Sequence, residues 1–503
     1  MTETPAAPQT ARIAIIGAGL AGLTAAYELN KQGLNKQGLN ENAPETKIDV
    51  YEATDRIGGK LYTVAFEAGP TDMGAEAFLS YRTDAMEFFE ELSLKNDITA
   101  SSSARSLVYC GGATHDLPTS GIMGIPSSSE PVKDIVSEAT AQRIDDEAEQ
   151  PGFAWTVGGD ANVGEIVRAR YGDEVADRLV SALLGGVYSC AADDLGVRAT
   201  MPQLAAEFDR LASESAGEGD GTVHLSTAVK NIEARRSQAA GNPSGQPKPA
   251  FAAFKGGYAQ LYETLAEKSG ADIYVDAFIS GIERAGNGYR LTGGEDTVYD
   301  HVILATPAPT TALLLKKIAP EASASLSTVK LANSVVVGLR FDGEGGVDKQ
   351  LPDNSGVLVA ADEPGITAKA FTFSSRKWPH IGERGGAMVR ASFGRFGDDI
   401  AIRASEDDLV DWALDDLQTI TGFDGRAAGL EEIYVQRWFG GLPRYDEHHL
   451  ATVAAVREKL ASVPGISVTG AWVGGVGVPA VIANAREVAT SVARGGAAGV
   501  GRA

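Results

Sequence analysis

Glycines near the start of the chain have the spacing of a nucleotide-binding turn. The apolar run Ile13–Ile16 leads into Gly17-Ala18-Gly19-Leu20-Ala21-Gly22, and a helix rich in small residues follows. Gly17 permits a tight turn, Gly19 lets the backbone approach a pyrophosphate, and Gly22 lets helix and strand pack closely. The N–H groups at the helix start and the ~0.5 positive charge of its dipole attract phosphate. The spacing alone also fits an ordinary glycine turn in an α/β protein.

A carboxylate at the end of the next strand strengthens the nucleotide interpretation. The strand Lys47–Tyr51 ends in Glu52, which can accept hydrogen bonds from a ribose diol. Glu52 follows Gly22 by 30 residues, against the usual ~20, because KQGLN occurs twice, at 31–35 and 36–40. We predict a lengthened surface loop without chemistry here, and a short helix extension is the alternative.

Two further glycine-rich stretches have the composition of nucleotide loops. Arg56, Gly58 and Gly59 follow the ribose strand and bring backbone and a cation towards a diphosphate. At the other end of the chain, GAWVGGVGVP at 470–479 places glycines before a helix that we expect from Ala480. This second helix start again offers N–H groups and a positive dipole end.

The composition excludes several classes of function. A chain of 503 residues has room for about three domains, and its formal net charge of −23 argues against nucleic acid. The two cysteines, Cys110 and Cys190, make neither a disulfide framework nor a metal set, which fits a reducing cytoplasm. Residues 1–11 lack the features of a signal peptide, and no apolar run reaches the ~18 residues of a spanning helix.

Catalytic side chains do not stand out. The pair His448-His449 favours a loop or helix-cap role, and we find no Ser-His-Asp or metal-ligand spacing. We therefore nominate no catalytic acid or base and predict no metal site.

Taken together, the glycine loops resemble the FAD-binding start of the amine oxidase superfamily of flavoproteins. Over nearly the whole chain the sequence resembles one branch of it, the protoporphyrinogen and coproporphyrinogen oxidases of haem synthesis. It is most similar to the bacterial forms that oxidise coproporphyrinogen III to coproporphyrin III. The motifs that carry the resemblance are GIMGIP (121–126), LLGGVYSCAADDLGVRATMPQL (183–204), SSRKWPH (374–380), RWFGGLPRY (437–445) and GGVGVP (474–479).

The resemblance implies a set of FAD contacts. They are Gly17, Ala18, Gly19, Leu20, Ala21, Gly22, Glu52, Ala53, Arg56, Gly59, Lys60, Gly74, Ala75, Glu76, Ala77, Ile279, Trp438, Ala471, Val476, Gly477 and Val478. Lys60 stands where an arginine is common in the superfamily, and Ala480-Val481 replaces a polar-cysteine pair of relatives. Members with covalent flavin attach it through a cysteine near the C-terminal glycines. The last cysteine here is Cys190, so FAD should be held non-covalently.

The fold expected from these patterns is α/β. A Rossmann-like FAD-binding domain is drawn from residues 1–105, 251–310 and 461–503. Residues 106–250 read as a helical insert, with a mobile segment at 213–250 because of its Gly, Ser, Gln and Pro content. Residues 311–460 read as a mixed-sheet substrate-binding domain, with one strand marked by alternating Val335, Val337 and Leu339.

The resemblance also implies a reaction. Six electrons leave the porphyrinogen in three two-electron (hydride) steps to flavin N5, and oxygen takes them up as peroxide. Because the substrate carries propionates, cations should line its pocket. The candidates are Arg376, Lys377, Arg437 and Arg444, with Lys255 weaker; for each, a surface salt bridge is the alternative. Trp378 and Phe373 either wall an apolar pocket or belong to the core.

Three other functions stay open from the sequence. The protein could oxidise protoporphyrinogen IX, or it could be an amine oxidase or desaturase of the superfamily, with Trp438 and Trp472 as an aromatic pair facing the flavin. The third is a flavin-binding regulatory protein without turnover. We expect a cytoplasmic protein, and the sequence leaves peripheral membrane contact and a transient contact with a ferrochelatase open.

Overall fold

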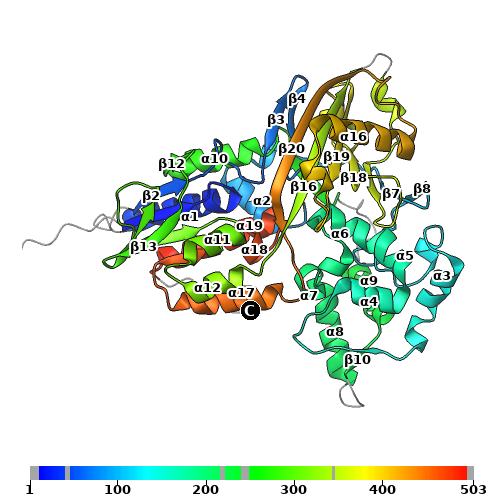
Figure 1. The fold of residues 1–503 in the computed structure, drawn as a ribbon, viewed down its shortest axis with the longest axis horizontal. Coiled ribbons are helices and arrows are strands. Elements are labelled where there is room, and N and C mark those ends of the chain that lie inside the picture. Colours follow the sequence, from blue (N-terminus) through cyan, green and yellow to red (C-terminus); the bar gives the residue numbers. More distant parts are fainter. Residues whose placement is uncertain (1–10, 40–45, 216–220, 240–248, 343–345, 496–503) are drawn as a thin grey trace, which may run out of the picture. The chain divides into compact units, whose positions relative to one another are not determined.

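The computed structural model describes residues 11–39, 46–215, 221–239, 249–342 and 346–495 (Figure 1). These residues form two compact units. Unit 1 lies within the ranges Met1–Ala100, Ala250–Lys330 and Ala451–Ala503, and unit 2 lies within Ser101–Pro249 and Leu331–Leu450. Each unit is therefore assembled from separate stretches of the chain.

A parallel five-stranded sheet organises unit 1. Its strand order is β12-β2-β1-β15-β21, and every neighbouring pair is parallel. The register sets Ile16 of β1 level with Tyr51 of β2 and Leu304 of β15, so the carboxyl ends of these strands meet at one edge. The strands are β1 Ala11–Ile16, β2 Thr46–Tyr51, β12 Asp272–Tyr274, β15 His301–Leu304 and β21 Ile466–Val468.

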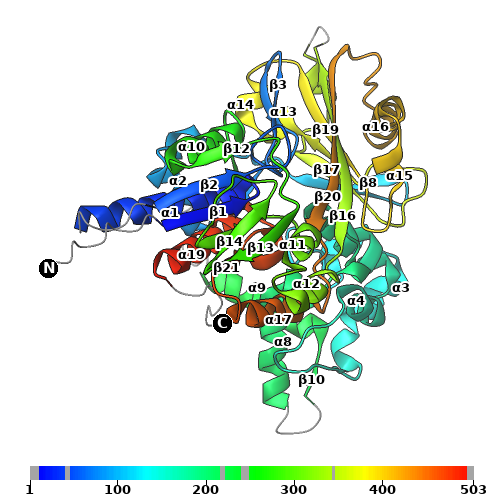
Figure 2. The same ribbon diagram turned by 60° about the vertical axis from the view of Figure 1, so that its left-hand side comes forward.

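Two apolar layers lie on the two faces of the parallel sheet of unit 1, and the elements that contribute to them can be followed in Figures 1 and 2. Ile13 and Ile15 of β1 pack under four helices, and Ala14 and Ile16 point into the other layer, as the two-residue period of a strand requires. The four helices are α1 Leu20–Leu39, α2 Thr83–Glu91, α10 Ala259–Ser269 and α19 Val478–Ala493. The other layer holds β13 Gly281–Ala285, β14 Gly288–Thr292, α11 Ala308–Leu315, α12 Pro320–Leu326 and α17 His449–Ala461.

Short strands complete unit 1. A hairpin of β3 and β4 follows the second glycine loop, and β11 pairs with β5 and β6. These elements are β3 Thr63–Phe66, β4 Gly69–Asp72, β5 Phe78–Leu79, β6 Ile98–Ala100, β11 Phe251–Phe254 and the short helix α18 Ala471–Gly474.

The duplicated KQGLN segment corrects our loop prediction. Helix α1 runs on to Leu39, so residues 31–39 extend the helix and do not form a loop. The Lys31 ammonium lies 2.5 Å from Glu91 of α2, and Gln32 donates to Glu28 one turn earlier. These contacts stabilise a helical continuation that the two glycines of the repeat disfavour.

A seven-stranded sheet organises one part of unit 2. Its order is β20-β16-β19-β18-β17-β7-β8, with β17 and β7 parallel and the other pairs antiparallel. The predicted strand around Val335, Val337 and Leu339 is confirmed as β16, and all three side chains are buried. The strands are β7 Ser106–Cys110, β8 Ala113–Asp116, β16 Leu331–Phe341, β17 Gly356–Val359, β18 Ala370–Phe373, β19 Ala387–Phe393 and β20 Leu430–Pro443.

Helices make up the rest of unit 2. Four of them follow strands of the sheet: α13 Ser374–Lys377, α14 Pro379–Gly382, α15 Ile400–Arg403 and α16 Glu406–Thr421. The expected helical insert contains α3 Glu138–Asp145, α4 Val163–Tyr171, α5 Asp173–Val175, α6 Ser181–Tyr188, α7 Val197–Thr200, α8 Pro202–Ser215, α9 Leu225–Ala239 and the strands β9 Phe153–Ala154 and β10 Thr222–Val223.

Helix α9 shows that the mobile-segment prediction for 213–250 is wrong where the structure describes it. Residues 216–220 and 240–248 lie outside the described residues. Glu147 is fully buried and accepts hydrogen bonds from the first backbone N–H groups of α9 and from Arg170 at 2.7 Å. At the other end, Arg235 of α9 pairs with the buried carboxylate of Glu207 at 2.5 Å. Hydrogen bonds and ion pairs to two buried carboxylates thus stabilise α9, although its amino-acid composition had suggested a solvent-exposed segment.

The unit boundaries differ from the expected domains, because residues 101–105 fall in unit 2 and residues 311–330 and 451–460 fall in unit 1. Helices α11 and α12, which we expected in the substrate-binding domain, belong to unit 1. Their apolar side chains, such as Leu315 and Leu326, pack with β15 in the second apolar layer. The helical residues 101–249 in turn share unit 2 with the seven-stranded sheet.

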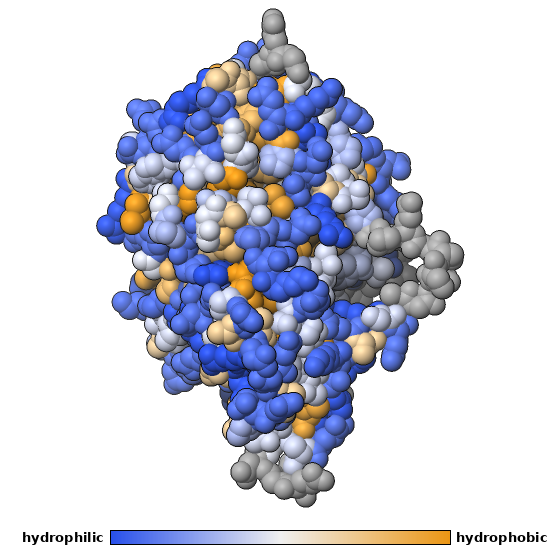
Figure 3. Space-filling view, turned by 90° about the vertical axis from the view of Figure 1, so that its right-hand side faces the viewer, coloured by the Kyte–Doolittle hydropathy of each residue, from blue (hydrophilic) through white to orange (hydrophobic). Residues whose placement is uncertain are grey.

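Hydrophilic residues predominate on the face drawn in Figure 3, and hydrophobic residues form scattered patches on it. Exposed large apolar side chains include Tyr81, Ile400 and Phe439. Within the described parts of the chain, no helix combines the length and hydropathy that crossing a bilayer requires.

Replacing Glu147 with alanine is expected to lower the free energy of unfolding by about 3–5 kcal/mol. Burial alone would raise the pKa of Glu147, but hydrogen bonds from Ser226, Leu225 and Arg170 outweigh it and hold the pKa below its ordinary value. Urea unfolding at pH 7 measures the loss. The exposed neighbour Glu149 is the control, and Glu149→Ala should change stability by less than about 0.5 kcal/mol. Equal stability of both variants would contradict this account.

Candidate functional site

The first glycine turn closes with backbone contacts that a side chain would block. The Gly17 N–H donates to the Tyr51 carbonyl at 2.7 Å, which ties the turn to β2. Gly17 has φ +105°, and a Cβ there would lie 2.7 Å from the Ala305 carbonyl oxygen. A Cβ on Gly22 would collide with the Gly17 carbonyl oxygen. The α1 N-terminus therefore lies close to the end of β1, as a dinucleotide turn requires.

The second glycine loop lies directly against the first. The Gly58 N–H donates to the Ala18 carbonyl at 2.9 Å. Gly59 has φ +60°, and a Cβ on it would lie 2.8 Å from the Cα of Gly19. Two loops about 40 residues apart in the chain thus meet through backbone atoms, with no side chain between them.

Arg56 makes contacts within the second glycine loop. Its guanidinium donates to the carbonyls of Gly59 at 2.9 Å and Ile57 at 3.1 Å, and it lies 4.0 Å from the Tyr62 ring centroid. These contacts hold the second glycine loop in shape. A direct contact of Arg56 with a diphosphate stays a prediction.

Glu52 is positioned by the glycine turn. Its Oε2 accepts the Ala18 N–H at 2.9 Å, and its Oε1 accepts the Thr54 N–H at 3.0 Å. The carboxylate is half-buried at the carboxyl end of β2, beside the exposed Ala53. The Thr54 hydroxyl also donates to Oε1 at 2.9 Å, and because two carboxylate oxygens offer about four lone-pair sites, room remains to accept a ribose hydroxyl group.

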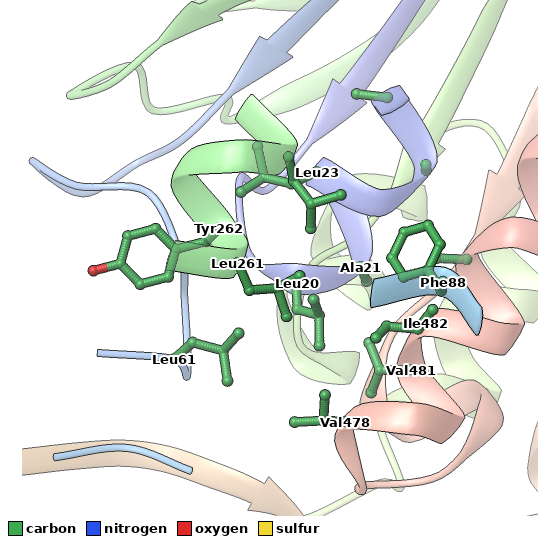
Figure 4. Packing of buried hydrophobic residues seen from close by; sticks show 14 of the residues in the cluster. Leu20, Ala21, Leu23, Leu61, Phe88, Leu261, Tyr262, Val478, Val481 and Ile482 are labelled. Carbon is green, nitrogen blue, oxygen red and sulfur yellow. The ribbon is translucent and has the colours of Figure 1, made fainter. Parts of the chain in front are cut away.

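The start of α19 packs against the start of α1 (Figure 4). Leu20 of α1, Leu61 of the second loop and Val478 of α19 belong to one buried cluster. Gly477 caps α19 in an extended conformation, and Pro479 occupies its first turn. Val476, Gly477 and Ala471 stay accessible to solvent. Two helix N-termini with glycines before them therefore meet in unit 1, and each has backbone N–H groups without intrahelical acceptors.

A third loop is connected to these two. The Met73 N–H donates to the Tyr62 carbonyl at 2.7 Å, and the Ala75 N–H donates to the Lys60 carbonyl at 3.4 Å. Asp72 accepts the Tyr258 N–H at 3.0 Å, which adds the 254–258 loop. Gly74, Ala75, Glu76 and Ala77 are all half-buried beside the second loop.

Lys60 and Ile279 complete the predicted contacts in unit 1. Lys60 is exposed to solvent at the end of the second glycine loop. Ile279 is 4% exposed and packs in the second apolar layer. The residues present fit FAD: two accessible helix N-termini, a glycine-lined surface and a ribose-side carboxylate lie together in one unit.

The substrate candidates Arg376, Lys377, Arg437 and Arg444 all lie in unit 2, with Trp438. Arg376 and Lys377 belong to α13 directly after β18, and Arg437 lies in β20. Strands β16 and β19 separate β18 from β20, a gap of about 14 Å at the usual strand spacing. The structure therefore does not bring all four cations together.

Each of the four candidates already has a protein partner. Arg376 pairs with Asp348 at 3.2 Å, and Arg444 pairs with Asp446 at 2.6 Å. Arg437 donates to the Ala404 carbonyl at 2.9 Å, and the Lys377 ammonium lies 5.0 Å from the Trp378 ring centroid. Propionate binding by these residues stays a prediction.

Three aromatic side chains turn out to be core residues. Phe373 and Trp378 are fully buried, which favours core packing over a pocket wall. Trp472 is 2% exposed, and its indole N–H donates to the Thr306 carbonyl at 3.1 Å. A ring buried in this way does not face a substrate as one member of an aromatic pair.

The histidine pair has the structural role that we expected. His449 begins α17 and stacks on Tyr445 at 3.9 Å between ring centroids, and His448 is exposed. No cluster of three metal-ligating side chains occurs among the residues that the structure describes.

Sequence reasoning missed a buried cation in unit 2. Lys369 is 4% exposed, and its ammonium donates to Ser189 Oγ at 2.6 Å and to the Gly394 carbonyl at 2.7 Å. Burial, together with the charge of Arg395, lowers the pKa of Lys369 to about 7. An isolated lysine between alanines in the sequence gives no signal of this environment.

Comparison with known proteins agrees with this site. A family model described as flavin containing amine oxidoreductase matches residues 20–493. Coproporphyrinogen III oxidase of Mycobacterium tuberculosis is 39% identical over 479 residues, covering 95% of this chain and 96% of the relative. Coproporphyrinogen III oxidase of Bacillus subtilis is 27% identical over 474 residues, covering 93% and 94%.

Solved structures share the fold. A protein from Exiguobacterium sp. 255-15, named for protoporphyrinogen oxidation, superposes with a TM-score of 0.79 at 24% identity, covering 97% of this chain and 99% of the other. Cyclohexylamine oxidase from Brevibacterium oxydans gives a TM-score of 0.64 at 17% identity, covering 97% and 99%.

Replacing Gly59 with alanine is expected to weaken FAD binding at least tenfold. The added Cβ meets Gly19 Cα and forces the two glycine loops apart. Titration of the apoprotein with FAD, followed by flavin fluorescence, measures the dissociation constant. Gly112→Ala is the matched control, because Gly112 also has a positive φ but a Cβ there meets nothing within 4 Å. Unchanged FAD affinity in Gly59→Ala would show that close contact between the two glycine loops is not needed for FAD binding.

The buried Lys369 predicts a pH-dependent difference in stability. Above pH 7 the folded protein has lost the Lys369 proton, whereas the unfolded chain keeps it up to a pKa of about 10.4. The unfolding free energy of the wild type should therefore fall relative to Lys369→Met by about 1.4 kcal/mol for each pH unit below 9, down to pH 7.

Urea unfolding of both proteins with saturating FAD at pH 6, 7.5 and 9 tests this slope. Lys349→Met removes an exposed lysine of the same unit and should show no pH-dependent difference from the wild type. If the difference in unfolding free energy between the wild type and Lys369→Met does not change with pH, the lowered pKa of Lys369 is refuted.

Proposed function

We propose, because the chain belongs to the flavin containing amine oxidoreductase family, that this FAD-dependent oxidase oxidises a porphyrinogen. The observation that carries the proposal is the 39% identity to a coproporphyrinogen III oxidase along almost the full length of both chains. Relatives named for one reaction over such a span support the same substrate class here.

The finer proposal is that the substrate is coproporphyrinogen III and the product coproporphyrin III. The macrocycle loses six hydrogen atoms, which three molecules of oxygen take up as three molecules of hydrogen peroxide. FAD, when bound, supplies the two-electron acceptor for each round. Oxygen as the final acceptor, a place in haem synthesis, a cytoplasmic location and a transient contact with a ferrochelatase also belong to the proposal.

The residues of unit 1 explain how the chain would hold the cofactor. The N–H groups at the starts of α1 and α19 would bind anionic and carbonyl oxygens, and Glu52 would accept the ribose hydroxyl groups. The glycines at 17, 19 and 59 let backbone approach without a side chain in the way. Cys110 and Cys190, the two cysteines of the chain, are both in unit 2 and buried. Non-covalent binding follows from this set of contacts.

The amine oxidase alternative has less support. The solved amine oxidases share the fold at 16–17% identity, which carries no substrate information. This alternative needs Trp438 and Trp472 as an aromatic pair that faces the flavin, but the Trp472 ring is buried in unit 1.

Purified protein should convert coproporphyrinogen III to a fluorescent porphyrin with about three molecules of peroxide per porphyrin. The rate should exceed that of heat-inactivated protein under the same oxygen tension. Protoporphyrinogen IX should be oxidised with a lower kcat/KM, and putrescine and cyclohexylamine should release no peroxide. Peroxide from either amine, or no enzymatic porphyrin from either porphyrinogen, would refute the proposed function.

A further inference from the structure

Two neighbouring cations in unit 2 have neutral hydrogen-bond acceptors. Lys369 donates to a hydroxyl and a carbonyl, and Arg395 donates through Nη2 to the Val359 carbonyl at 2.9 Å. Among the described residues, no carboxylate oxygen lies within ion-pair distance of either side chain. The charge of Arg395 is one of the two causes that lower the pKa of Lys369.

Arg395 has donors to spare. A guanidinium carries five N–H donors, and the described residues satisfy one of them. Its Nε is buried without an acceptor in the described part of the chain. Burial also lowers the pKa of Arg395 from its ordinary value, and Asp398 offsets part of that effect. Asp398 itself uses Oδ1 to accept the Ile400 N–H at 2.9 Å.

The end of helix α6 offsets a small part of this positive charge. Ser189 ends α6 in a left-handed conformation with φ 53°, and its hydroxyl accepts the Lys369 ammonium. A helix C-terminus carries about half a negative charge. The guanidinium charge of Arg395 exceeds this partial charge, and the Lys369 ammonium adds to the excess below its pKa of about 7, so an anion would balance the site.

Glycines of helix α6 lie beside Arg395, next to aliphatic side chains. A Cβ on Gly185 would lie 3.5 Å from Arg395 Nε, and one on Gly186 would lie 3.5 Å from Leu358 Cδ2. Gly186 is exposed, and Val187 is 46% exposed. A ligand that combines an apolar ring with a carboxylate matches this pairing of Arg395 with glycines and aliphatic side chains.

We propose that Arg395, with Lys369 behind it, binds one of the two propionates that coproporphyrinogen III has and protoporphyrinogen IX lacks, and so favours a macrocycle with four propionates over one with two. This inference rests on the proposed function. Arg395 makes the contact with the carboxylate. Lys369 is a positioning residue, which holds Ser189 and Gly394 in place near Arg395.

Porphyrin binding tests the proposal without turnover. Coproporphyrin III has four propionates and protoporphyrin IX has two, and quenching of their fluorescence reports the dissociation constant of each. Arg395→Gln should weaken coproporphyrin III binding about tenfold or more, as expected for loss of a charge-assisted hydrogen bond, and should weaken protoporphyrin IX binding less. Arg395→Lys should bind with intermediate affinity, because lysine keeps the charge but loses the guanidinium fork.

Controls separate this role from a structural one. Arg403→Gln removes an arginine of the same unit that is 79% exposed and should change neither dissociation constant. The bound FAD and the urea midpoint of each variant are measured alongside. Wild-type affinity in Arg395→Gln, or equal losses for both porphyrins, would overturn the proposal.

Steady-state kinetics then distinguish the proposal from the proposed function. In Arg395→Gln, the KM for coproporphyrinogen III should rise more than kcat falls, and the preference over protoporphyrinogen IX should shrink. If Arg395→Gln does not fold, the Arg395→Lys comparison decides, and wild-type selectivity in it would count against the guanidinium contact. A wild type that binds porphyrin selectively but turns over neither porphyrinogen would refute the proposed function alone.

Discussion

The close approach of backbone to backbone at the glycine turn is the constraint on which unit 1 depends. Gly22 packs on the Gly17 carbonyl, and Gly59 packs on Gly19, with no room for a Cβ at Gly22 or Gly59. This approach lets α1 begin at the carboxyl edge of the sheet, where Glu52 and the start of α19 also lie. A dinucleotide is then held mostly by peptide groups, whose positions are fixed by the fold and not by side-chain rotamers.

Local sequence patterns predicted much of the fold, and the wrong predictions, for α9 and for the extension of α1, share one physical cause. Strands such as β1 and β16 are evident from runs or alternation of apolar residues. Helix α9 is not, because its stability comes from Glu147 and Glu207, buried acids outside its own sequence. The extension of α1 likewise depends on Glu91 of another helix. Tertiary contacts override composition in each case.

The candidate site also has one part that local sequence patterns predict and another that depends on tertiary contacts. Glycines at this spacing, between an apolar strand and a helix, are typical of nucleotide turns, so the cofactor side of the site was readable from the sequence. Arginines serve many purposes: Arg376 and Arg444 looked available for an anionic substrate, and the structure gives both an aspartate partner. Arg395 attracted no notice in the sequence, although it lies beside glycines and the described residues accept only one of its donors. Whether a cation is already neutralised depends on neighbours that only the folded chain brings together.

The discontinuous layout of unit 1 has a consequence for its biosynthesis. The glycine turn is translated before β21 and α19, which lie beside β15 and α1 and follow much later in the chain. Until α19 is synthesised, the nascent chain therefore carries only the first part of the nucleotide site, and the apolar residues of α1 that pack against α19 lack that partner. The cofactor site is therefore complete only after α19 has been synthesised and has packed against α1.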